Sequence, residues 1–209
     1  MRVLVAGATG KTGRLLVRDL KEQGHEPVAM VRESSDTSVL PEGTETRLAD
    51  LSDLPGDVAA DVDAVIFAAG SGGDTDEEMT RKIDRDGAKA LIDKAAEAKI
   101  KRFVMLSSKG ADTPEQAPDG MACYLEAKHA ADVYLRDAGM EFAIVRPVAL
   151  TDDQGKGMIE LAGHVEGEEI ARADVARVLT AATEDASIKG KTFEIASGST
   201  LISDAMKTV

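Results

Sequence analysis

Short, continuously apolar runs alternate with segments of helical periodicity along most of this chain. Each run is too short to form a helix of ordinary length, and the runs lie at residues 2–6, 27–31, 45–49, 64–69, 103–106 and 142–145. Strands that are apolar on both faces are typical of parallel sheets that helices cover on both sides. The alternation therefore predicts an α/β fold, a doubly wound parallel sheet with helices on both faces.

Apolar residues at helical spacing mark the segments between these runs. After the first run, Leu16 and Leu20 keep helical spacing up to a stop at Gly24, and longer helices are expected at 77–99 and 123–138. Right-handed crossovers would place the carboxyl ends of the strands, and the loops that follow them, along one edge of the sheet. We expect the functional site at that edge.

The region after Pro147 differs in composition from the rest of the chain. Residues 151–169 are polar and glycine-rich, residues 173–184 predict a helix, and residues 191–196 predict a last strand. We expect a single domain over residues 1–209, with a small C-terminal cap from about residue 148 onward. A cap of this size implies a shallow pocket or a small substrate.

The chain is strongly acidic, since 38 Asp and Glu residues against 25 Lys and Arg give a net charge of −13. Nucleic acid and an anionic membrane would be repelled over most of such a surface, so neither is expected as a partner. The single cysteine can form no internal disulfide, we expect no signal peptide ahead of the first strand, and no apolar run reaches the roughly 18 residues of a membrane span. We expect a cytoplasmic monomer or homodimer. The three histidines are scattered, and no metal site is expected.

Glycines at positions 7, 10 and 13 form the junction between the first strand and the first helix. Gly7 permits a sharp turn out of the strand, Gly10 leaves no side chain between the backbone and an anion, and Gly13 lets the helix lie against the sheet. The helix points unpaired N–H groups and the positive end of its dipole at this turn. The junction predicts a site for the diphosphate of a dinucleotide, contacted by Gly7, Thr9, Gly10, Lys11, Thr12 and Gly13.

The end of the second strand bears on the choice between NADP and NAD. A basic residue there neutralises the 2′-phosphate of NADP, whereas a carboxylate binds the ribose hydroxyls of NAD. This chain has Arg32, and Ser35 follows closely enough to add a hydrogen bond. We expect NADP in preference to NAD; the alternative for Arg32 is an exposed loop arginine.

Two further segments are expected along the dinucleotide. Asp50, just past the third strand, is placed to accept a hydrogen bond from the adenine amino group, with backbone contact from Leu51. The alternative for Asp50 is a helix cap near Ser52. At the end of the fourth strand, small residues leave room for the ribose and the nicotinamide; they are Ala68, Ala69 and Gly70.

Tyr124 and Lys128 are four residues apart on a predicted helix and therefore lie one turn apart on one face. The fifth strand leads into Ser107 and Ser108, so that a hydroxyl, a phenol and a lysine would converge at one edge. A lysine cation about 4 Å from a phenol favours the phenolate by roughly 4 kcal/mol at an effective dielectric of about 20. We expect Tyr124 to act as proton donor, Lys128 to tune it and to bind ribose, and one of the serines to polarise the acceptor. The alternatives are a half-buried helix tyrosine and a solvated lysine.

Taken in order, six segments resemble the atypical short-chain dehydrogenase/reductases. The resemblance is to small bacterial NAD(P)-binding proteins described as NAD-dependent epimerase/dehydratase-like or NAD(P)H-binding. The segments are residues 7–13 (GATGKTG), 30–32 (MVR), 68–73 (AAGSGG), 101–108 (KRFVMLSS), 124–128 (YLEAK) and 144–147 (IVRP).

This resemblance implies a Rossmann fold with the dinucleotide at the Gly7 loop. It also implies a Tyr-x-x-x-Lys pair at Tyr124 and Lys128, a family serine at position 107 or 108, and passage of Pro147 and Val148 near the nicotinamide. The sequence lacks the large C-terminal substrate domain of better-known epimerases, so nucleotide-sugar chemistry is not expected.

Three functions remain open at this point. The first is an NADP(H)-binding oxidoreductase that reduces a small carbonyl or a similar electrophile. The second is a non-catalytic NADP(H)-binding redox sensor or scaffold, whose partner is another protein. The third is an epimerase or dehydratase that retains NAD through its cycle.

Overall fold

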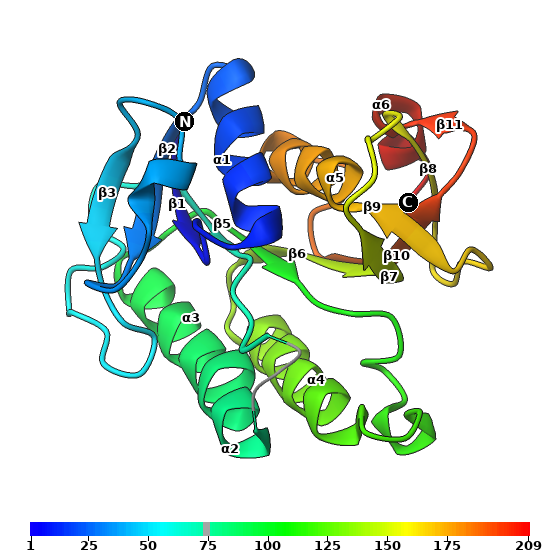
Figure 1. The fold of residues 1–209 in the computed structure, drawn as a ribbon, viewed down its shortest axis with the longest axis horizontal. Coiled ribbons are helices and arrows are strands. Elements are labelled where there is room, and N and C mark those ends of the chain that lie inside the picture. The colour runs from blue at the N-terminus through cyan, green and yellow to red at the C-terminus, as the bar shows by residue number, and fades with distance from the viewer. Residues whose placement is uncertain (73–75) are drawn as a thin grey trace.

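A central, mostly parallel β-sheet runs through the computed structural model, which describes residues 1–72 and 76–209 (Figure 1). Across the parallel part of the sheet the order is β3-β2-β1-β4-β5-β6-β10. This order confirms the predicted doubly wound fold, in which the chain builds outward from β1 in both directions. The strands are β1 (Arg2–Ala6), β2 (Glu26–Val31), β3 (Glu45–Leu48), β4 (Ala64–Phe67), β5 (Arg102–Leu106), β6 (Glu141–Pro147) and β10 (Lys191–Ser197).

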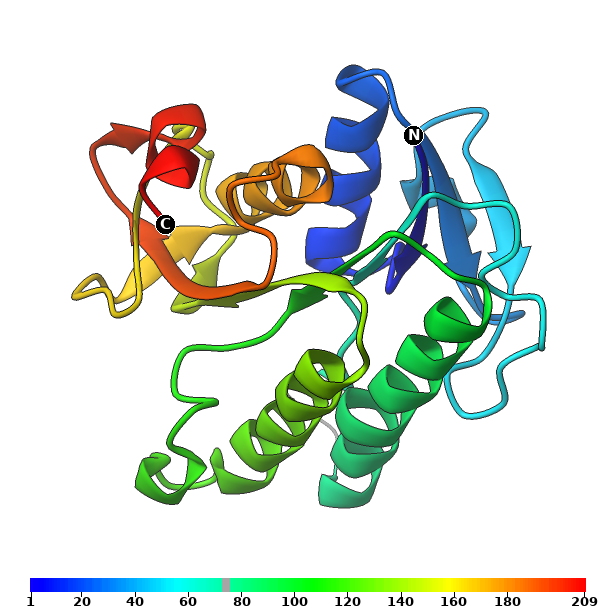
Figure 2. The ribbon, with the colours of Figure 1, turned by 180° about the vertical axis from the view of Figure 1, so that it is seen from behind.

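Helices cover both faces of the sheet. In Figure 1, α1 (Lys11–Glu22) and α5 (Arg172–Glu184) lie on one face, and α3 (Ala88–Glu97) and α4 (Ala122–Asp137) on the other, which Figure 2 shows from behind. Successive side chains of β1 point to opposite faces, so Val3 and Val5 pack on the α1 side while Leu4 packs on the α3 side. Two apolar layers, one on each face, therefore pack the sheet against its helices.

The predicted helix over 77–99 is continuous in space but not uniform. It begins as α2 (Glu77–Thr80), passes through a π-helical turn at Arg81–Gly87 and continues as α3. A Cβ at Gly87 would lie 2.8 Å from the Leu51 Cβ, so the glycine lets this helix approach the segment that follows β3. The π-helical turn also buries Asp84, and such turns are frequent at functional sites.

The polar, glycine-rich region 151–169 contains strands that its composition did not indicate. β8 (Met158–Ala162) pairs antiparallel with β10, and β11 (Thr200–Leu201) pairs with β8. β7 (Ala149–Thr151) and β9 (Glu169–Ala171) form a separate parallel pair, and α6 (Ile202–Ala205) follows β11. The cap therefore extends the sheet beyond β10.

Several shorter features complete the description. Single 3₁₀ turns lie at Thr37–Val39, Pro114–Gln116 and Met206–Thr208. Gly73, the last glycine of the AAGSGG segment, lies outside the described residues. Within residues 1–72 and 76–209, no helix is both long and apolar enough to cross a bilayer. The same residues contain no group of three or more His, Cys, Asp or Glu that could hold a metal ion.

Candidate functional site

Gly7 and Gly13 bring three backbone segments into contact at the carboxyl end of β1. Gly7 has a φ of +80°, a conformation that favours glycine, and a Cβ there would lie 2.6 Å from the Cα of Ala69. A Cβ at Gly13 would overlap the carbonyl oxygen of Gly7. Gly10 closes the turn between them, because its N–H donates to that same oxygen at 3.0 Å.

The first turn of α1 presents free amides at this junction. The first bond into the helix runs from the Arg14 N–H to the Gly10 carbonyl (3.0 Å), and Gly10 provides no side-chain cap. In the described residues, the N–H groups of Lys11, Thr12 and Gly13 have no acceptor. No acidic residue stands in this turn to occupy them. Unpaired amides at a helix start fit the diphosphate of a dinucleotide.

Lys11 is the basic side chain of this turn, and it points toward the C-terminal cap. Its Nζ lies 2.8 Å from Asp152 Oδ2, while the other oxygen of Asp152 accepts a hydrogen bond from Arg172 at 2.7 Å. The hydrogen bond from Lys11, aided by the Arg172 charge, holds the pKa of Asp152 below its ordinary value. Asp152 therefore bridges Lys11, the first residue of α1, and Arg172, the first residue of α5.

Arg32 follows β2 with an exposed side chain. Its backbone N–H donates to Ser35 Oγ, and the Ser35 N–H donates back to the Arg32 carbonyl, both at 3.0 Å. Ser35 thus closes the turn that presents Arg32. The guanidinium has no hydrogen bond or ion pair with any residue in 1–72 or 76–209, so it is free to meet an anion.

Asp50 is engaged in its own turn. Its Oδ1 accepts hydrogen bonds from the Ser52 N–H (2.8 Å) and the Ser52 Oγ (2.7 Å). These bonds, with the nearby charge of Arg32, lower the pKa of Asp50. Asp50 therefore caps a turn rather than a helix. Both bonds use Oδ1, so Oδ2 remains available to a ligand. Leu51 is buried beside it.

Tyr124 and Lys128 lie on one face of α4, but a third residue holds the lysine. The Lys128 side chain is only 3% exposed, and its Nζ lies 2.9 Å from Asp84 Oδ1 and 3.3 Å from the Leu106 carbonyl oxygen. The ammonium stands 5.6 Å from the centre of the Tyr124 ring. Burial lowers the pKa of Lys128, but the Asp84 carboxylate outweighs this, so the net pKa is raised and the lysine stays charged.

Asp84 also binds the backbone at the end of β4. Its Oδ2 accepts a hydrogen bond from the Ser71 N–H at 2.9 Å, and a Cβ at Gly70 would lie 3.3 Å from its Oδ1. The small residues Ala68, Ala69 and Gly70 therefore run between the Gly7 turn and the Asp84–Lys128 pair. One buried carboxylate fastens the β4 loop, the π-helical turn and α4 to one another.

The two candidate serines have different surroundings. Ser107 is buried, and its hydroxyl donates to Asp132 Oδ2 at 2.9 Å, an oxygen that also accepts two bonds from Arg146. Burial raises the pKa of Asp132, and the Arg146 charge opposes it. Ser108 is half-buried, and its hydroxyl reaches only the Lys109 carbonyl at 3.3 Å. Of the two serines, Ser108 therefore has the hydroxyl that remains available to hydrogen-bond a ligand.

Pro147 ends β6 and Val148 follows it, and backbone groups of both are already bonded. The Pro147 carbonyl accepts from the Lys109 N–H at 3.0 Å, and the Val148 N–H donates to the Ile195 carbonyl at 3.1 Å. Both side chains are buried. Contact with a nicotinamide here would be made by van der Waals packing.

Sequence reasoning overlooked the two buried aspartates. Asp132 is eight residues after Tyr124 and four after Lys128, so helical spacing already placed it on their face. Asp84 is seven residues before the apolar Leu91, so helical spacing places its carboxylate on the stripe of the helix that faces the core. A charged residue on a buried face was the available signal in both cases.

A doubly wound sheet with a glycine turn at β1 and free amides at α1 defines a Rossmann-type nucleotide-binding protein. Residues 7–186 match the family model described as NAD(P)H-binding. The chain belongs to this family, which confirms the resemblance noted in the sequence.

Named relatives extend over nearly the whole chain. The chain is 37% identical over 212 residues to the Bacillus subtilis protein named uncharacterized sugar epimerase YhfK, with 99% of each covered. It is 27% identical over 254 residues to sanguinarine reductase of Eschscholzia californica, covering 99% of this chain and 93% of that protein. A Bacillus halodurans structure with the provisional name NAD-dependent epimerase/dehydratase superposes over 100% of both chains with a TM-score of 0.94 at 39% identity.

Proposed function

We propose that this protein is an NADPH-dependent oxidoreductase that reduces a small carbonyl compound or a similar electrophile. The observation that carries the proposal is the Gly7–Gly13 turn with three free amides at the start of α1. The name of the related sanguinarine reductase supports reduction as the reaction type. When bound, NADPH supplies the hydride for such a reduction.

The preference for NADPH rests on Arg32. Its guanidinium makes no hydrogen bond or ion pair within the described residues, and the Ser35 turn holds its backbone in place. An unpaired guanidinium at the end of β2 suits the 2′-phosphate, to which it can donate two parallel hydrogen bonds.

The proton for the product oxygen is assigned to the Tyr124 hydroxyl. Lys128 stays charged next to the ring, 5.6 Å from its centre, and this positive charge stabilises the phenolate left after the proton is donated. Ser108 donates a hydrogen bond to the acceptor oxygen, since the Ser107 hydroxyl is committed to Asp132. Lys128 itself transfers no proton in this scheme; its role is to place a positive charge beside the Tyr124 ring.

Coenzyme affinity tests the Arg32 assignment. Calorimetry with NADPH and NADH should show that Arg32→Ala weakens NADPH binding by roughly ten- to a hundredfold, because a charged hydrogen bond is lost, and leaves NADH binding unchanged. Arg18→Ala, which removes another exposed arginine from α1, is the control and should change neither. An undiminished preference for NADPH in Arg32→Ala would refute the assignment.

Turnover tests the Tyr124 assignment. NADPH consumption over a panel of carbonyls and quinones identifies a substrate, and Tyr124→Phe should then lower kcat by about 10²- to 10⁴-fold. The chain offers a matched control in Tyr134→Phe, since Tyr134 binds Asp93 at the surface. Equal rates in wild type and Tyr124→Phe would remove this residue from the mechanism.

Two other functions have specific support. The commitment of Ser107 to Asp132 and of Lys128 to Asp84 favours a coenzyme-binding sensor without turnover. Tight NADPH binding, no activity over the panel and a protein partner released by NADPH would establish it. The epimerase names of YhfK and the Bacillus halodurans protein favour an enzyme that retains its coenzyme. NAD that copurifies with the protein would point to this function.

A further inference from the structure

The carboxylate of Asp152 lies between the first residues of two helices. Its Oδ2 accepts a hydrogen bond from Lys11 Nζ at 2.8 Å, and its Oδ1 accepts one from Arg172 at 2.7 Å. Lys11 begins α1 at the Gly7–Gly13 turn, whereas Arg172 begins α5 on the side of the C-terminal cap. Within residues 1–72 and 76–209, neither basic side chain has another hydrogen-bond or ion-pair partner. Asp152 therefore occupies both cations at once.

The backbone around Asp152 is fixed on both sides. Before it, β7 pairs with β9 as far as Thr151. After it, the chain is fastened to α5, because the Gly157 N–H donates to the buried Asp174 carboxylate at 2.8 Å. Asp152 is thus held on the α5 side, and the movable member of its contact with α1 is the long side chain of Lys11.

Lys11 also belongs to the turn that is proposed to hold the coenzyme diphosphate. Its own N–H is one of the three free amides at the start of α1. Because the Cα–Cβ bonds of a helix tilt toward its N-terminus, the Lys11 side chain leaves the helix on the side of these amides. The Lys11 and Asp152 side chains are 63% and 60% exposed, so their ion pair is weak and open to exchange. An anion bound by the amides would compete with Asp152 for the Lys11 ammonium group.

We propose that Asp152 is an internal competitor of the coenzyme diphosphate for Lys11. In the free protein, Lys11 is bound to the cap through Asp152; when coenzyme is bound, Lys11 binds the diphosphate instead and Asp152 remains with Arg172. Asp152 thereby lowers coenzyme affinity, because an ion pair has to be broken and a fixed carboxylate stays close to the bound anion. Since NADPH and NADH both carry the diphosphate, the effect is the same for both. This inference rests on the proposed coenzyme site but not on the proposed reduction.

Calorimetry of the full-length protein with NADPH and with NADH tests the competition. Asp152→Asn should bind each coenzyme about three- to tenfold more tightly than wild type, because no ion pair has to be broken and no carboxylate faces the anion. The gain should be equal for the two coenzymes, whereas Arg32→Ala should affect NADPH alone. Absence of saturable binding to wild type would refute the coenzyme site and this inference with it. Binding by wild type without a gain in Asp152→Asn would overturn the inference alone.

A double-mutant cycle with Lys11 separates this contact from a general effect of charge. Lys11→Met should weaken the binding of both coenzymes, because a cation is lost from the diphosphate. Adding Asp152→Asn to Lys11→Met should then improve binding by less than about twofold, since the competition needs both residues. A gain in the Lys11→Met background equal to that of Asp152→Asn alone would overturn the proposal, because Lys11 would then play no part in it.

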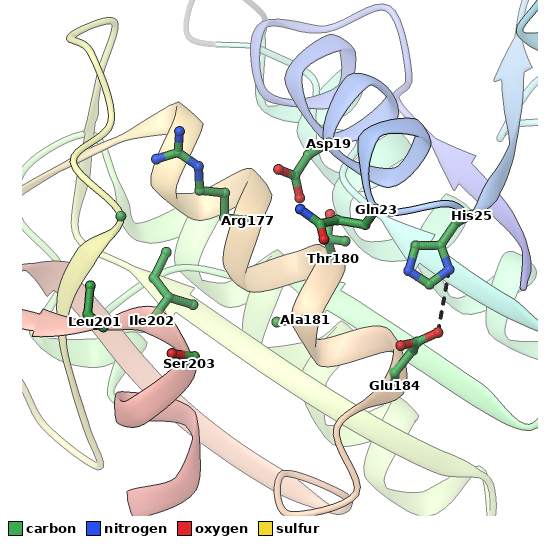
Figure 3. A pocket seen from close by; sticks show the side chains of 11 residues that line it. Asp19, Gln23, His25, Arg177, Thr180, Ala181, Glu184, Leu201, Ile202 and Ser203 are labelled. Atoms are coloured by element: carbon green, nitrogen blue, oxygen red, sulfur yellow. Dashed lines mark ion pairs between the residues drawn. The ribbon is translucent and has the colours of Figure 1, made fainter.

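Asp19→Asn is the matched control, since it removes the same charge from α1 outside the Gly7–Gly13 turn. Figure 3 shows Asp19 beside the hollow that α1 and α5 line, and it is roughly 12 Å from Lys11 along the helix axis. This separation exceeds the Debye length of about 8 Å at physiological ionic strength, so coenzyme affinity should hardly change. Circular dichroism checks that every variant is folded. Equal tightening by Asp19→Asn would show that the overall charge is responsible and would overturn the proposal.

Discussion

At the scale of single residues, Gly13 is the most constrained position of the nucleotide turn. Its missing Cβ is the space that the Gly7 carbonyl oxygen occupies, and neither backbone segment can move without parting β1 from α1. The sequence pattern assigned Gly13 to helix–sheet packing, and the contact with Gly7 gives that role its physical cause.

Gly13→Ala should therefore both destabilise the protein and weaken NADPH binding. Forcing a methyl group into a packed contact costs about 1–3 kcal/mol, and displacement of the first turn of α1 misaligns its free amides. Thermal melting and calorimetry with NADPH measure the two effects. Gly56→Ala is the control, since a Cβ there meets nothing within 4 Å. Wild-type stability and affinity in Gly13→Ala would contradict this packing.

Ser107 and Ser108 are adjacent in sequence, but removal of their hydroxyl groups should have different effects: Ser107→Ala should lower stability, and Ser108→Ala should lower turnover. Ser107→Ala takes a donor from the buried Asp132, so we expect a loss of stability of about 1–3 kcal/mol. Ser108→Ala removes a half-buried hydroxyl with one weak bond, so stability should hold while turnover falls. Urea unfolding and the NADPH consumption assay separate the two effects. If Ser108→Ala lowered stability and Ser107→Ala lowered only turnover, the structural role would belong to Ser108 and the catalytic role to Ser107.

At the scale of elements, the buried Asp84–Lys128 pair joins the π-helical turn to α4. Removing one member of a buried ion pair leaves an uncompensated charge and typically costs about 3–5 kcal/mol. We expect Asp84→Asn and Lys128→Met each to destabilise the protein by such an amount, and the double variant to recover most of it. Urea unfolding of all four proteins measures the coupling. Additive losses would show that the two residues do not act as a pair.

The pair also predicts the direction of a pH effect. Because the pKa of Lys128 is raised above its ordinary value of 10.5, its stabilising contribution is complete below that value and is lost as pH rises through the folded-state pKa. The free energy of unfolding should therefore fall more steeply in wild type than in Lys128→Met above about pH 10.5. Parallel pH curves for the two proteins would contradict the raised pKa.

Strands β1, β2, β4, β5 and β6 could be predicted from the sequence because they are largely apolar runs, whereas β3 has the polar, mostly exposed sequence Glu-Thr-Arg-Leu and was wrongly taken as apolar. β8 was not predicted, because Met158–Ala162 is short and lies among glycines and charged residues, and only pairing with β10 makes it a strand. The π-helical turn leaves the apolar spacing of 77–99 unchanged, so the pattern there predicts a plain helix. The partners of Lys128 and Ser107 come from distant segments, which no local pattern specifies.

At the scale of the whole molecule, the net charge of −13 opposes the compact state through self-repulsion. Salt screens this repulsion over a Debye length of about 8 Å at physiological ionic strength. We expect the Tm to rise by several degrees as sodium chloride increases from near zero to about 0.15 M. Sucrose at matched osmolality is the uncharged comparison. A Tm that stays constant or falls with salt would show that local ion pairs outweigh the overall charge.

The central sheet ends in short strands on both sides. β11 has 2 residues and β3 has 4, so each outer rim offers few unpaired backbone groups to a neighbouring molecule. Growth of fibrils by strand addition needs a long, flat template, which neither rim provides. A concentrated solution of the folded protein should accordingly resist ordered aggregation, and any such deposits would have to start from chains that have lost these terminal strands.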